Sequence, residues 1–144
     1  MKTEMLFAKR ARKIHRILIV EDEPLVAFDN EHFLRDAGYE IVATVDTVPE
    51  AAAHIAAHKP DLVLADVSLS DGGNGLDIAR AAKAKKIPVI FVTGSNLDGE
   101  AKLAMGVLAK PYNQRDLLAT IEAVDAKLGG GKPKRVPKGL TLFD

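Results

Sequence analysis

The sequence predicts an α/β fold in which a doubly wound, five-stranded parallel sheet carries helices on both faces. Three observations support this fold class. Five short apolar runs alternate along the chain with amphipathic helical patterns. The runs are rich in aliphatic residues and lack the apolar–polar alternation of half-exposed strands, so both faces of each strand should be buried. Repeated strand–helix alternation requires crossover connections and therefore parallel pairing.

The predicted strands are the five apolar runs. The first is wholly aliphatic, the third follows the Lys59-Pro60 dipeptide, and the last is the weakest. The five ranges are Ile17–Val20, Glu40–Val45, Asp61–Ala65, Ile87–Val92 and Gly106–Ala109.

The predicted helices fill the gaps between these runs. Pro24 suits the first turn of a helix that continues to about Ala37, where Gly38 ends it. Its apolar positions predict a broad buried face, formed by Leu25, Val26, Phe28, His32, Phe33 and Ala37. The other helices are predicted from Pro49 through Ile55, from Gly75 to about Lys85, and from an Asn113 cap to Leu128.

Composition limits the class of protein. The chain has 144 residues, 47% of them hydrophobic and none of them cysteine. This length fits one domain with a real core, and the absence of cysteine excludes disulfides and Cys-ligated zinc. No apolar run approaches the roughly 18 residues of a membrane span, and the apolar stretch near the N-terminus is too short for a secretory signal. We therefore expect a cytoplasmic protein without a membrane span.

Charge is distributed unevenly. Residues 1–16 carry six Lys or Arg and one Glu, and residues 129–144 carry four Lys or Arg and one Asp, whereas the segment between them is acidic. We expect a basic N-terminal extension over 1–14, a domain over 15–128, and a flexible Gly/Lys/Pro-rich tail over 129–144. An acidic body does not favour direct DNA binding, and we interpret the basic ends as solvated.

Polar side chains follow four of the predicted strands. In open α/β sheets the ligand crevice lies at the carboxyl ends of the strands, so these side chains should meet there. They are Glu21 and Asp22 after the first strand, Asp66 after the third, Thr93 after the fourth, and Lys110 after the fifth.

The chemistry of this set points to a metal and a phosphoryl group. Two carboxylates about 4 Å apart repel by about 4 kcal/mol at an effective dielectric near 20, so a cation should neutralise them. Oxygen ligands with room for water suit Mg²⁺. Asp66 is then a candidate carboxylate nucleophile, while Lys110 and the Thr93 hydroxyl can contact phosphoryl oxygens.

The same segments resemble the bacterial response-regulator receiver domain, a flavodoxin-like, CheY-like family. The resemblance covers about residues 15–128 and rests on four segments in the right order and spacing. These are ILIVEDEP at 17–24, KPDLVLADVSL at 59–69, FVTG at 91–94, and Lys110-Pro111.

The resemblance implies a role for each site residue. Asp66 would be the phosphoacceptor, Asp22 a direct Mg²⁺ ligand, Glu21 a partner that often acts through water, and the Ser68 carbonyl a further ligand. Thr93 would be the switch hydroxyl and Lys110 the phosphate-pairing lysine, with a cis peptide bond to Pro111.

The resemblance also implies the biology. The domain would accept a phosphoryl group from a phosphohistidine of a sensor kinase or phosphotransfer protein. Phosphorylation would then switch a surface that binds a downstream protein. A homodimer would be one form of this output. It would be a signalling domain rather than an enzyme. Because the sequence leaves no room for an output domain, we expect a stand-alone receiver. The switching surface would comprise the segment after Thr93, the last strand and the last helix.

Three positions depart from the family pattern. Ser70 replaces the proline usually found four residues after the acceptor, in a loop that is one residue longer than usual. Val107 occupies the place of the usual aromatic switch residue. The segment between Thr93 and Lys110 is short by about one helical turn, which leaves room for a stub of helix near 100–105. FVTG also partly matches a receiver branch with Phe-Ala-Thr-Gly there, associated with alphaproteobacterial stress signalling.

Other readings stay open. The chain could be the receiver of a longer regulator, or a receiver-like module that works without phosphorylation. A phosphohydrolase with an aspartate nucleophile is less favoured, because Pro24 stands where such enzymes place a second aspartate after the first strand. We interpret Glu23 as a first-turn helix acid. The four histidines, His15, His32, His54 and His58, are expected to be solvated surface residues.

Overall fold

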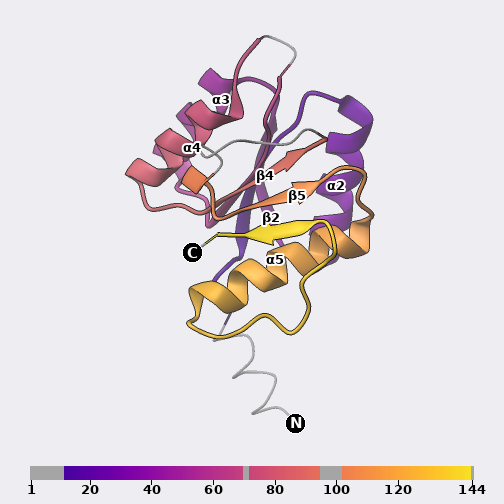
Figure 1. Ribbon diagram of the computed structural model, residues 1–144. Coiled ribbons are helices and arrows are strands. Elements are labelled where there is room, and N and C mark those ends of the chain that lie inside the picture. Colours follow the sequence, from indigo (N-terminus) through magenta and orange to yellow (C-terminus); the bar gives the residue numbers. More distant parts are fainter. Residues whose placement is uncertain (1–11, 70–71, 95–101, 144) are drawn as a thin grey trace.

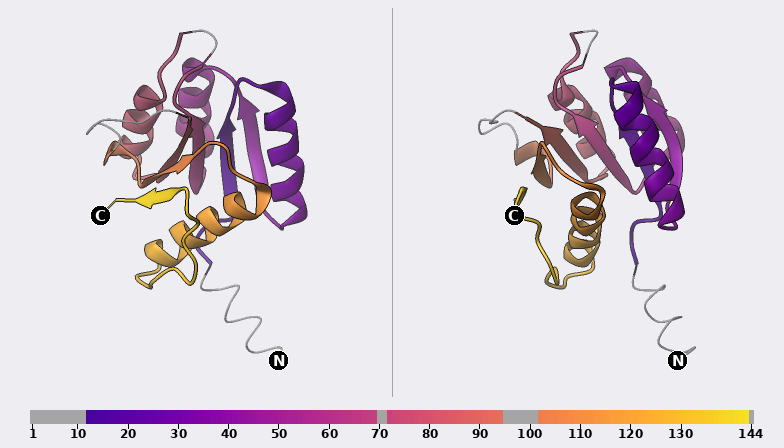
Figure 2. Two further views of the ribbon diagram at one scale, coloured as in Figure 1. Left: turned by 45° about the vertical axis from the view of Figure 1, so that its right-hand side comes forward. Right: turned by 90° about the vertical axis from the view of Figure 1, so that its right-hand side faces the viewer.

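The computed structural model describes residues 12–69, 72–94 and 102–143, and these form a six-stranded sheet flanked by helices (Figures 1 and 2). The strands are β1 (Arg16–Val20), β2 (Glu40–Val45), β3 (Leu62–Asp66), β4 (Val89–Thr93), β5 (Gly106–Ala109) and β6 (Leu140–Leu142). The helices are α2 (Pro24–Asp36), α3 (Val48–His58), α4 (Gly75–Ala84) and α5 (Gln114–Leu128).

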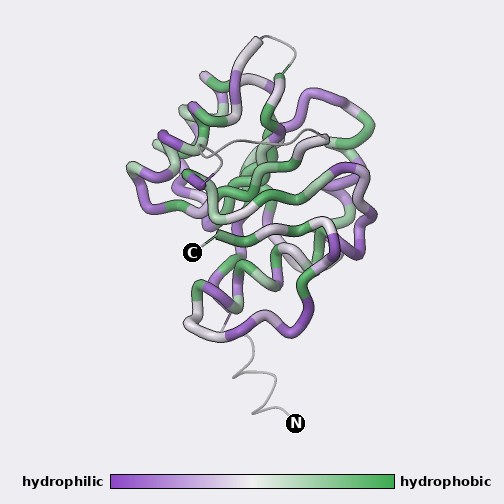
Figure 3. The backbone as a smooth tube through the Cα atoms, in the orientation of Figure 1, coloured by the Kyte–Doolittle hydropathy of each residue, from purple (hydrophilic) through white to green (hydrophobic). Residues whose placement is uncertain are grey.

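The sheet is doubly wound. Its order is β2-β1-β3-β4-β5-β6, and the first five strands in this order are parallel. Neighbouring residues of each strand face opposite layers, so Ile17 and Ile19 pack with α2 and α5 while Leu18 and Val20 pack with α3 and α4. Figure 3 shows the resulting apolar centre. The order reverses between β1 and β3, which places the ligand crevice at the carboxyl ends of those strands.

The predicted fold class and helices are confirmed. Pro24 lies in the first turn of α2, as expected. Asn113 caps α5 through a capping box: its side chain accepts from the Asp116 amide, and the Asp116 side chain accepts from the Asn113 amide. Residues 95–101 lie outside the described part, so the predicted stub of helix near 100–105 is described only in part. There Lys102 and Leu103 form one 3₁₀ turn before β5.

A sixth strand corrects the predicted five-stranded sheet. β6 lies within the segment expected to be a flexible tail, an expectation that is wrong for these residues. It pairs antiparallel with the outer edge of β5, and Leu140 is only 7% exposed. Gly106 allows this pairing, because a Cβ there would lie 2.5 Å from the Thr141 carbonyl oxygen. The close approach of two backbones requires glycine.

The predicted apolar face of α2 is too broad. Leu25 is 79% exposed and Phe28 is 59% exposed, while Ala27 and Leu34 are buried. The sheet and α5 contact only a narrow stripe of the helix, and Phe28 instead packs on the His32 ring with centroids 4.2 Å apart. His54 also departs from the expectation of full solvation, since it is half-buried and stacks on His58. None of the described helices is long and apolar enough to cross a membrane.

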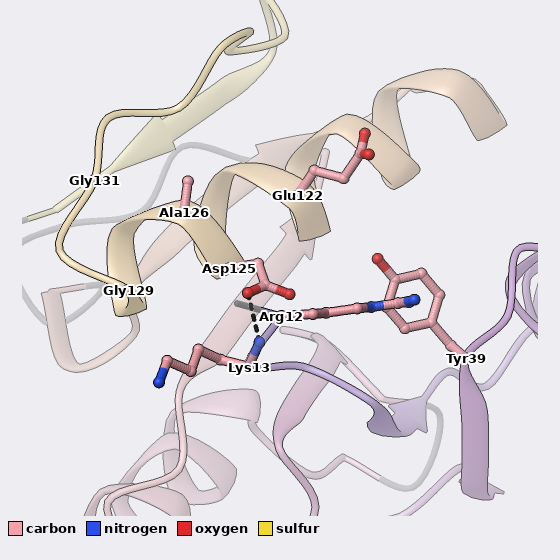
Figure 4. Close-up of a pocket in the computed structure, with 8 residues that line it drawn as sticks. All are labelled: Arg12, Lys13, Tyr39, Glu122, Asp125, Ala126, Gly129 and Gly131. Carbon is pink, nitrogen blue, oxygen red and sulfur yellow. Dashed lines mark hydrogen bonds between the residues drawn. The ribbon is translucent and has the colours of Figure 1, made fainter. Parts of the chain in front are cut away.

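The segment before β1 belongs to the folded body. Ile14, assigned by the sequence to the N-terminal extension, is fully buried. The Asp125 carboxylate of α5 accepts hydrogen bonds from the amides of Lys13 at 2.7 Å and Ile14 at 3.2 Å. In the pocket beside them, the Arg12 guanidinium lies 3.9 Å above the Tyr39 ring (Figure 4). This pocket lies at the amino ends of the strands, opposite the predicted site.

Replacing Asp125 with alanine should lower the free energy of unfolding by about 2 kcal/mol, because two backbone amides lose a charged acceptor. Urea unfolding followed by circular dichroism measures the change. Glu122→Ala, at an exposed position of the same helix, is the matched control and should shift stability by less than about 0.5 kcal/mol. Equal effects of the two substitutions would show that Asp125 does not anchor the segment.

Candidate functional site

Three carboxylates meet at the carboxyl ends of β1 and β3. Glu21 and Asp22 follow β1, and Asp66 is the last residue of β3. The two strands are neighbours, with Val20 opposite Ala65, which brings the residues that follow them side by side. One oxygen from each carboxylate lies within 4.8 Å of the others. The predicted convergence of these three residues is therefore present.

Lys110 supplies the positive charge in this cluster. Its Nζ donates a hydrogen bond to Asp66 Oδ2 at 3.0 Å and lies 3.8 Å from Glu21 Oε1. Burial alone would lower the pKa of Lys110, but the hydrogen bond to Asp66 and the charge of Glu21 outweigh it and raise the pKa above its usual value. The lysine therefore stays charged and holds the Asp66 carboxylate in place.

Glu21 is the most deeply placed acid. Its side chain is only 7% exposed, and one of its oxygens accepts a hydrogen bond from the Asp22 amide. Burial, followed by the hydrogen bond with Asp66, raises its pKa to about 7, and the charge of Lys110 only partly opposes this shift. At neutral pH without a cation, Glu21 is thus divided between its protonated and charged forms.

Thr93 and Lys110 are joined through the backbone. Thr93 ends β4 and is buried, and it lies opposite Ala109 in β5. The Lys110 amide donates to the Thr93 carbonyl oxygen at 2.8 Å, and the peptide bond from Lys110 to Pro111 is cis, as the resemblance implied. Asp66 pairs with Val92 in the adjacent register, so Thr93 lies one residue beyond the acceptor candidate.

Ser68 lies in the loop after β3. It is exposed and forms a backbone bridge with Asn74, while the Gly75 amide donates to the Val67 carbonyl oxygen at 2.8 Å. These contacts fold the loop back on itself beside Asp66. Ser70 lies outside the described residues. The role of the Ser68 carbonyl as a metal ligand stays a prediction.

The donor set fits Mg²⁺. It consists of carboxylate oxygens alone, which this hard cation prefers, and the cluster carries more negative than positive charge when all three acids are ionised. Asp22 and Asp66 would hold the ion directly and Glu21 would support it, directly or through water.

We expect Mg²⁺ affinity to fall with acidity. Because the pKa of Glu21 is raised to about 7, the ion must compete with a proton, and affinity should drop by up to about tenfold per pH unit below that value. Isothermal titration calorimetry between about pH 6 and 8 measures this dependence. Glu21→Gln should flatten it. If the Mg²⁺ affinity of the unaltered protein stayed the same across this pH range, the role of Glu21 in holding the ion would be contradicted.

The structure also shows a residue pair that the sequence did not reveal. Asn30 of α2 donates a hydrogen bond to the Tyr112 hydroxyl at 2.8 Å and ties α2 to the loop after β5. Burial raises the pKa of Tyr112, with the Asn30 contact opposing. Both residues line a pocket next to Lys110. The two are far apart in the chain, and no local pattern marks them as partners.

A doubly wound sheet with paired acids, an aspartate, a threonine and a lysine at its carboxyl edge defines a receiver-type signalling domain. Residues 17–122 match the response regulator receiver domain family. The chain therefore belongs to this family, whose members are receiver domains of two-component response regulators and generally serve signalling rather than catalysis.

Similar proteins include a full-length regulator. The chain is 37% identical over 110 residues to the phyllosphere-induced regulator PhyR of Methylorubrum extorquens, a match that covers 73% of this chain and 41% of PhyR. It spans about half the length of the curated relatives that it matches.

Solved structures agree with the fold. A CheY-like receiver domain of Methanospirillum hungatei is 28% identical with a TM-score of 0.72, covering 79% of this chain and 95% of that one. The receiver domain of the sensor histidine kinase PA1611 of Pseudomonas aeruginosa is 25% identical with a TM-score of 0.66, covering 76% and 95%. That structure has a magnesium ion coordinated in its active-site cleft.

Proposed function

We propose that this chain accepts a phosphoryl group on Asp66 from a phosphohistidine of a sensor kinase or phosphotransfer protein, in a Mg²⁺-dependent reaction in the cytoplasm. The observation that carries the proposal is the Asp66 carboxylate held 3.0 Å from Lys110 Nζ within a three-carboxylate cluster. An anion that must accept a negatively charged group needs positive charge beside it, which Lys110 supplies and a bound Mg²⁺ would add.

The residues have distinct tasks in the transfer. A carboxylate oxygen of Asp66 forms a bond to phosphorus while the bond from phosphorus to the histidine nitrogen breaks. That nitrogen keeps the electron pair, and the imidazole leaves as a neutral ring because its other nitrogen already carries a proton. Lys110 transfers its contact from Asp66 to a phosphoryl oxygen, and the Thr93 hydroxyl donates to another. Bound Mg²⁺ would neutralise charge on the phosphoryl oxygens.

Asp66 is a better acceptor than its two neighbours. Glu21 is buried with a pKa raised to about 7, so much of it is protonated and unable to attack when no cation is bound. Asp22 follows β1 directly after Glu21, and in this proposal the two residues hold the metal ion. Asp66 lies on β3 between β1 and β4, with its Oδ2 atom 3.0 Å from Lys110 Nζ and its strand position one residue before Thr93 of β4.

The experiment is intact-mass measurement after incubation with acetyl phosphate. With Mg²⁺ present the protein should gain the mass of one phosphoryl group, and removal of the ion with EDTA should prevent the gain. Asp22→Asn should reduce the gain strongly, because a metal-holding charge is lost. An equal gain in EDTA, or none in the presence of Mg²⁺ and a competent kinase, would overturn the proposal.

The partners follow from this function. We propose a downstream protein partner, or a second copy of the chain, at the surface formed by β5 and α5. Within this proposal the signalling unit is the predicted domain over 15–128 together with Ile14 and β6, whether the chain acts alone or within a longer regulator. A module that works without phosphorylation is the competing function, and the mass measurement separates the two.

A further inference from the structure

The strand β6 occupies the outer edge of β5, the last of the parallel strands. Its residues Leu140, Thr141 and Leu142 pair with Leu108, Val107 and Gly106. Two further backbone bonds fix its ends: the Ala109 amide donates to Gly139 at 2.9 Å, and the Phe143 amide donates to Met105 at 2.8 Å. Figure 2 shows this segment, in yellow, returning along α5 to the edge of the sheet.

This attachment is short and lightly held. Leu140 is buried in the core shared by β5 and α5, but Thr141 is exposed and Leu142 only half-buried. The connection that precedes β6 is largely exposed, and its ion pair from Arg135 to Asp116 is 3.4 Å long between partly exposed side chains. Exposed ion pairs of this kind contribute little. The segment is held by the buried Leu140, the partly buried Leu142, a few backbone bonds and a hydrogen bond from Lys127 Nζ to the Phe143 carbonyl oxygen.

The inner edge of β5 leads directly to the candidate site. Thr93 pairs with Ala109, and the Lys110 amide donates to the Thr93 carbonyl oxygen at 2.8 Å. The Ala109 amide also donates to the carbonyl oxygen of Gly139, the residue just before β6. The carboxyl end of β5, which Lys110 follows directly, thus lies between Thr93 of β4 on one side and β6 on the other.

We infer that β6 is an internal strap whose pairing with β5 weakens when Asp66 carries a phosphoryl group. The inference rests on the proposed function. A phosphoryl group draws the Thr93 hydroxyl and the Lys110 ammonium toward itself, and both are attached to the end of β5 that holds Gly139. Release of the strap uncovers the outer edge of β5. By linkage, loss of the strap must favour phosphorylation by the same factor.

Amide hydrogen exchange measured by NMR tests the first direction. The chain is compared with and without beryllofluoride and Mg²⁺, a stable stand-in for the phosphoryl group. Exchange of the Ala109 and Phe143 amides should accelerate by about fivefold or more, the lower end of ordinary coupling. The amide of Leu64, in the centre of the sheet, should not change, and Asp66→Asn should show no acceleration.

The outcomes separate the two proposals. Resonance shifts around Asp66 without faster exchange at Ala109 and Phe143 would overturn the strap and leave the phosphoacceptor intact. Absence of any adduct, together with no mass gain from acetyl phosphate, would overturn the proposed function and with it the strap. If the Ala109 and Phe143 amides exchanged faster only when the beryllofluoride adduct is present, both the phosphoacceptor function and the strap would be supported.

A matched pair of substitutions in β6 tests the reverse direction. Leu140→Ala removes the buried anchor, whereas Thr141→Ala changes an exposed side chain of the same strand. In the presence of Mg²⁺, the dissociation constant of beryllofluoride should fall about fivefold for Leu140→Ala and stay unchanged for Thr141→Ala.

Gly106→Ala provides a second way to displace the strap, because its Cβ would meet the Thr141 carbonyl oxygen at 2.5 Å. It should strengthen the binding of beryllofluoride in the same direction. Circular dichroism identifies which variants remain folded. A folded variant with a released β6 and an unchanged affinity for beryllofluoride would overturn the inference.

Discussion

Asp66→Asn should remove phosphoryl acceptance. An amide oxygen is a far weaker nucleophile than a carboxylate, and the substitution also removes the charge that positions Lys110 at 3.0 Å. We expect the rate of mass gain from acetyl phosphate to fall by at least about a hundredfold, or about 2.7 kcal/mol of transition-state stabilisation. Intact-mass time courses measure the rate.

The control for this substitution is Asp77→Asn. Asp77 lies on α4, where it is exposed and pairs with Arg80 at 2.8 Å, away from the carboxylate cluster. Its substitution changes the same functional group and should leave the rate of mass gain within about twofold of the unaltered protein. Comparable losses in both variants would show that the effect is not specific to the site.

Gly75→Ala should destabilise the fold and disturb the site together. A Cβ at Gly75 would lie 2.7 Å from the Asp66 carbonyl oxygen and 2.9 Å from Val67 Cα, and both are backbone atoms that cannot move aside cheaply. We expect the free energy of unfolding to fall by about 3 kcal/mol. Urea unfolding measures this loss, and the mass-gain assay should show slower phosphorylation in the fraction that remains folded.

Gly129→Ala is the glycine control for this prediction. Gly129 follows α5, far from Asp66, and the nearest atoms to an added Cβ are 3.6 Å away. Its substitution should change stability by no more than about 0.5 kcal/mol. If Gly75→Ala lowered the free energy of unfolding as little as Gly129→Ala does, the start of α4 would not lie as close to the acceptor loop as described.

The sequence was sufficient for the parts of the molecule that depend on local pattern. The aliphatic run before Glu21 specifies a strand buried on both faces. Parallel pairing then brings Glu21 and Asp66 to the same edge of the sheet, and this does not depend on the exact lengths of the helices between the strands. The Asn113 cap has its partner only three residues away. Such short-range relations can be seen in a sequence.

The parts that were missed depend on contacts between distant segments. β6 is only three residues long, too short for a recognisable period, and its pairing depends on a glycine in β5 that admits the Thr141 carbonyl. The contact from Asn30 to Tyr112 joins α2 to the loop after β5. Leu25 and Phe28 followed the helical period, but the layers around α2 do not extend to them.

The most direct test of the central claim is chemical location of the phosphoryl group. After reaction with acetyl phosphate and Mg²⁺, sodium borohydride reduces an acyl phosphate to an alcohol with loss of phosphate, which converts an aspartate to homoserine. Peptide mapping should find homoserine at position 66 and nowhere else. Reduction at Asp22, or a stable phosphoryl group on a hydroxyl or histidine side chain with Asp66 unmodified, would contradict the account.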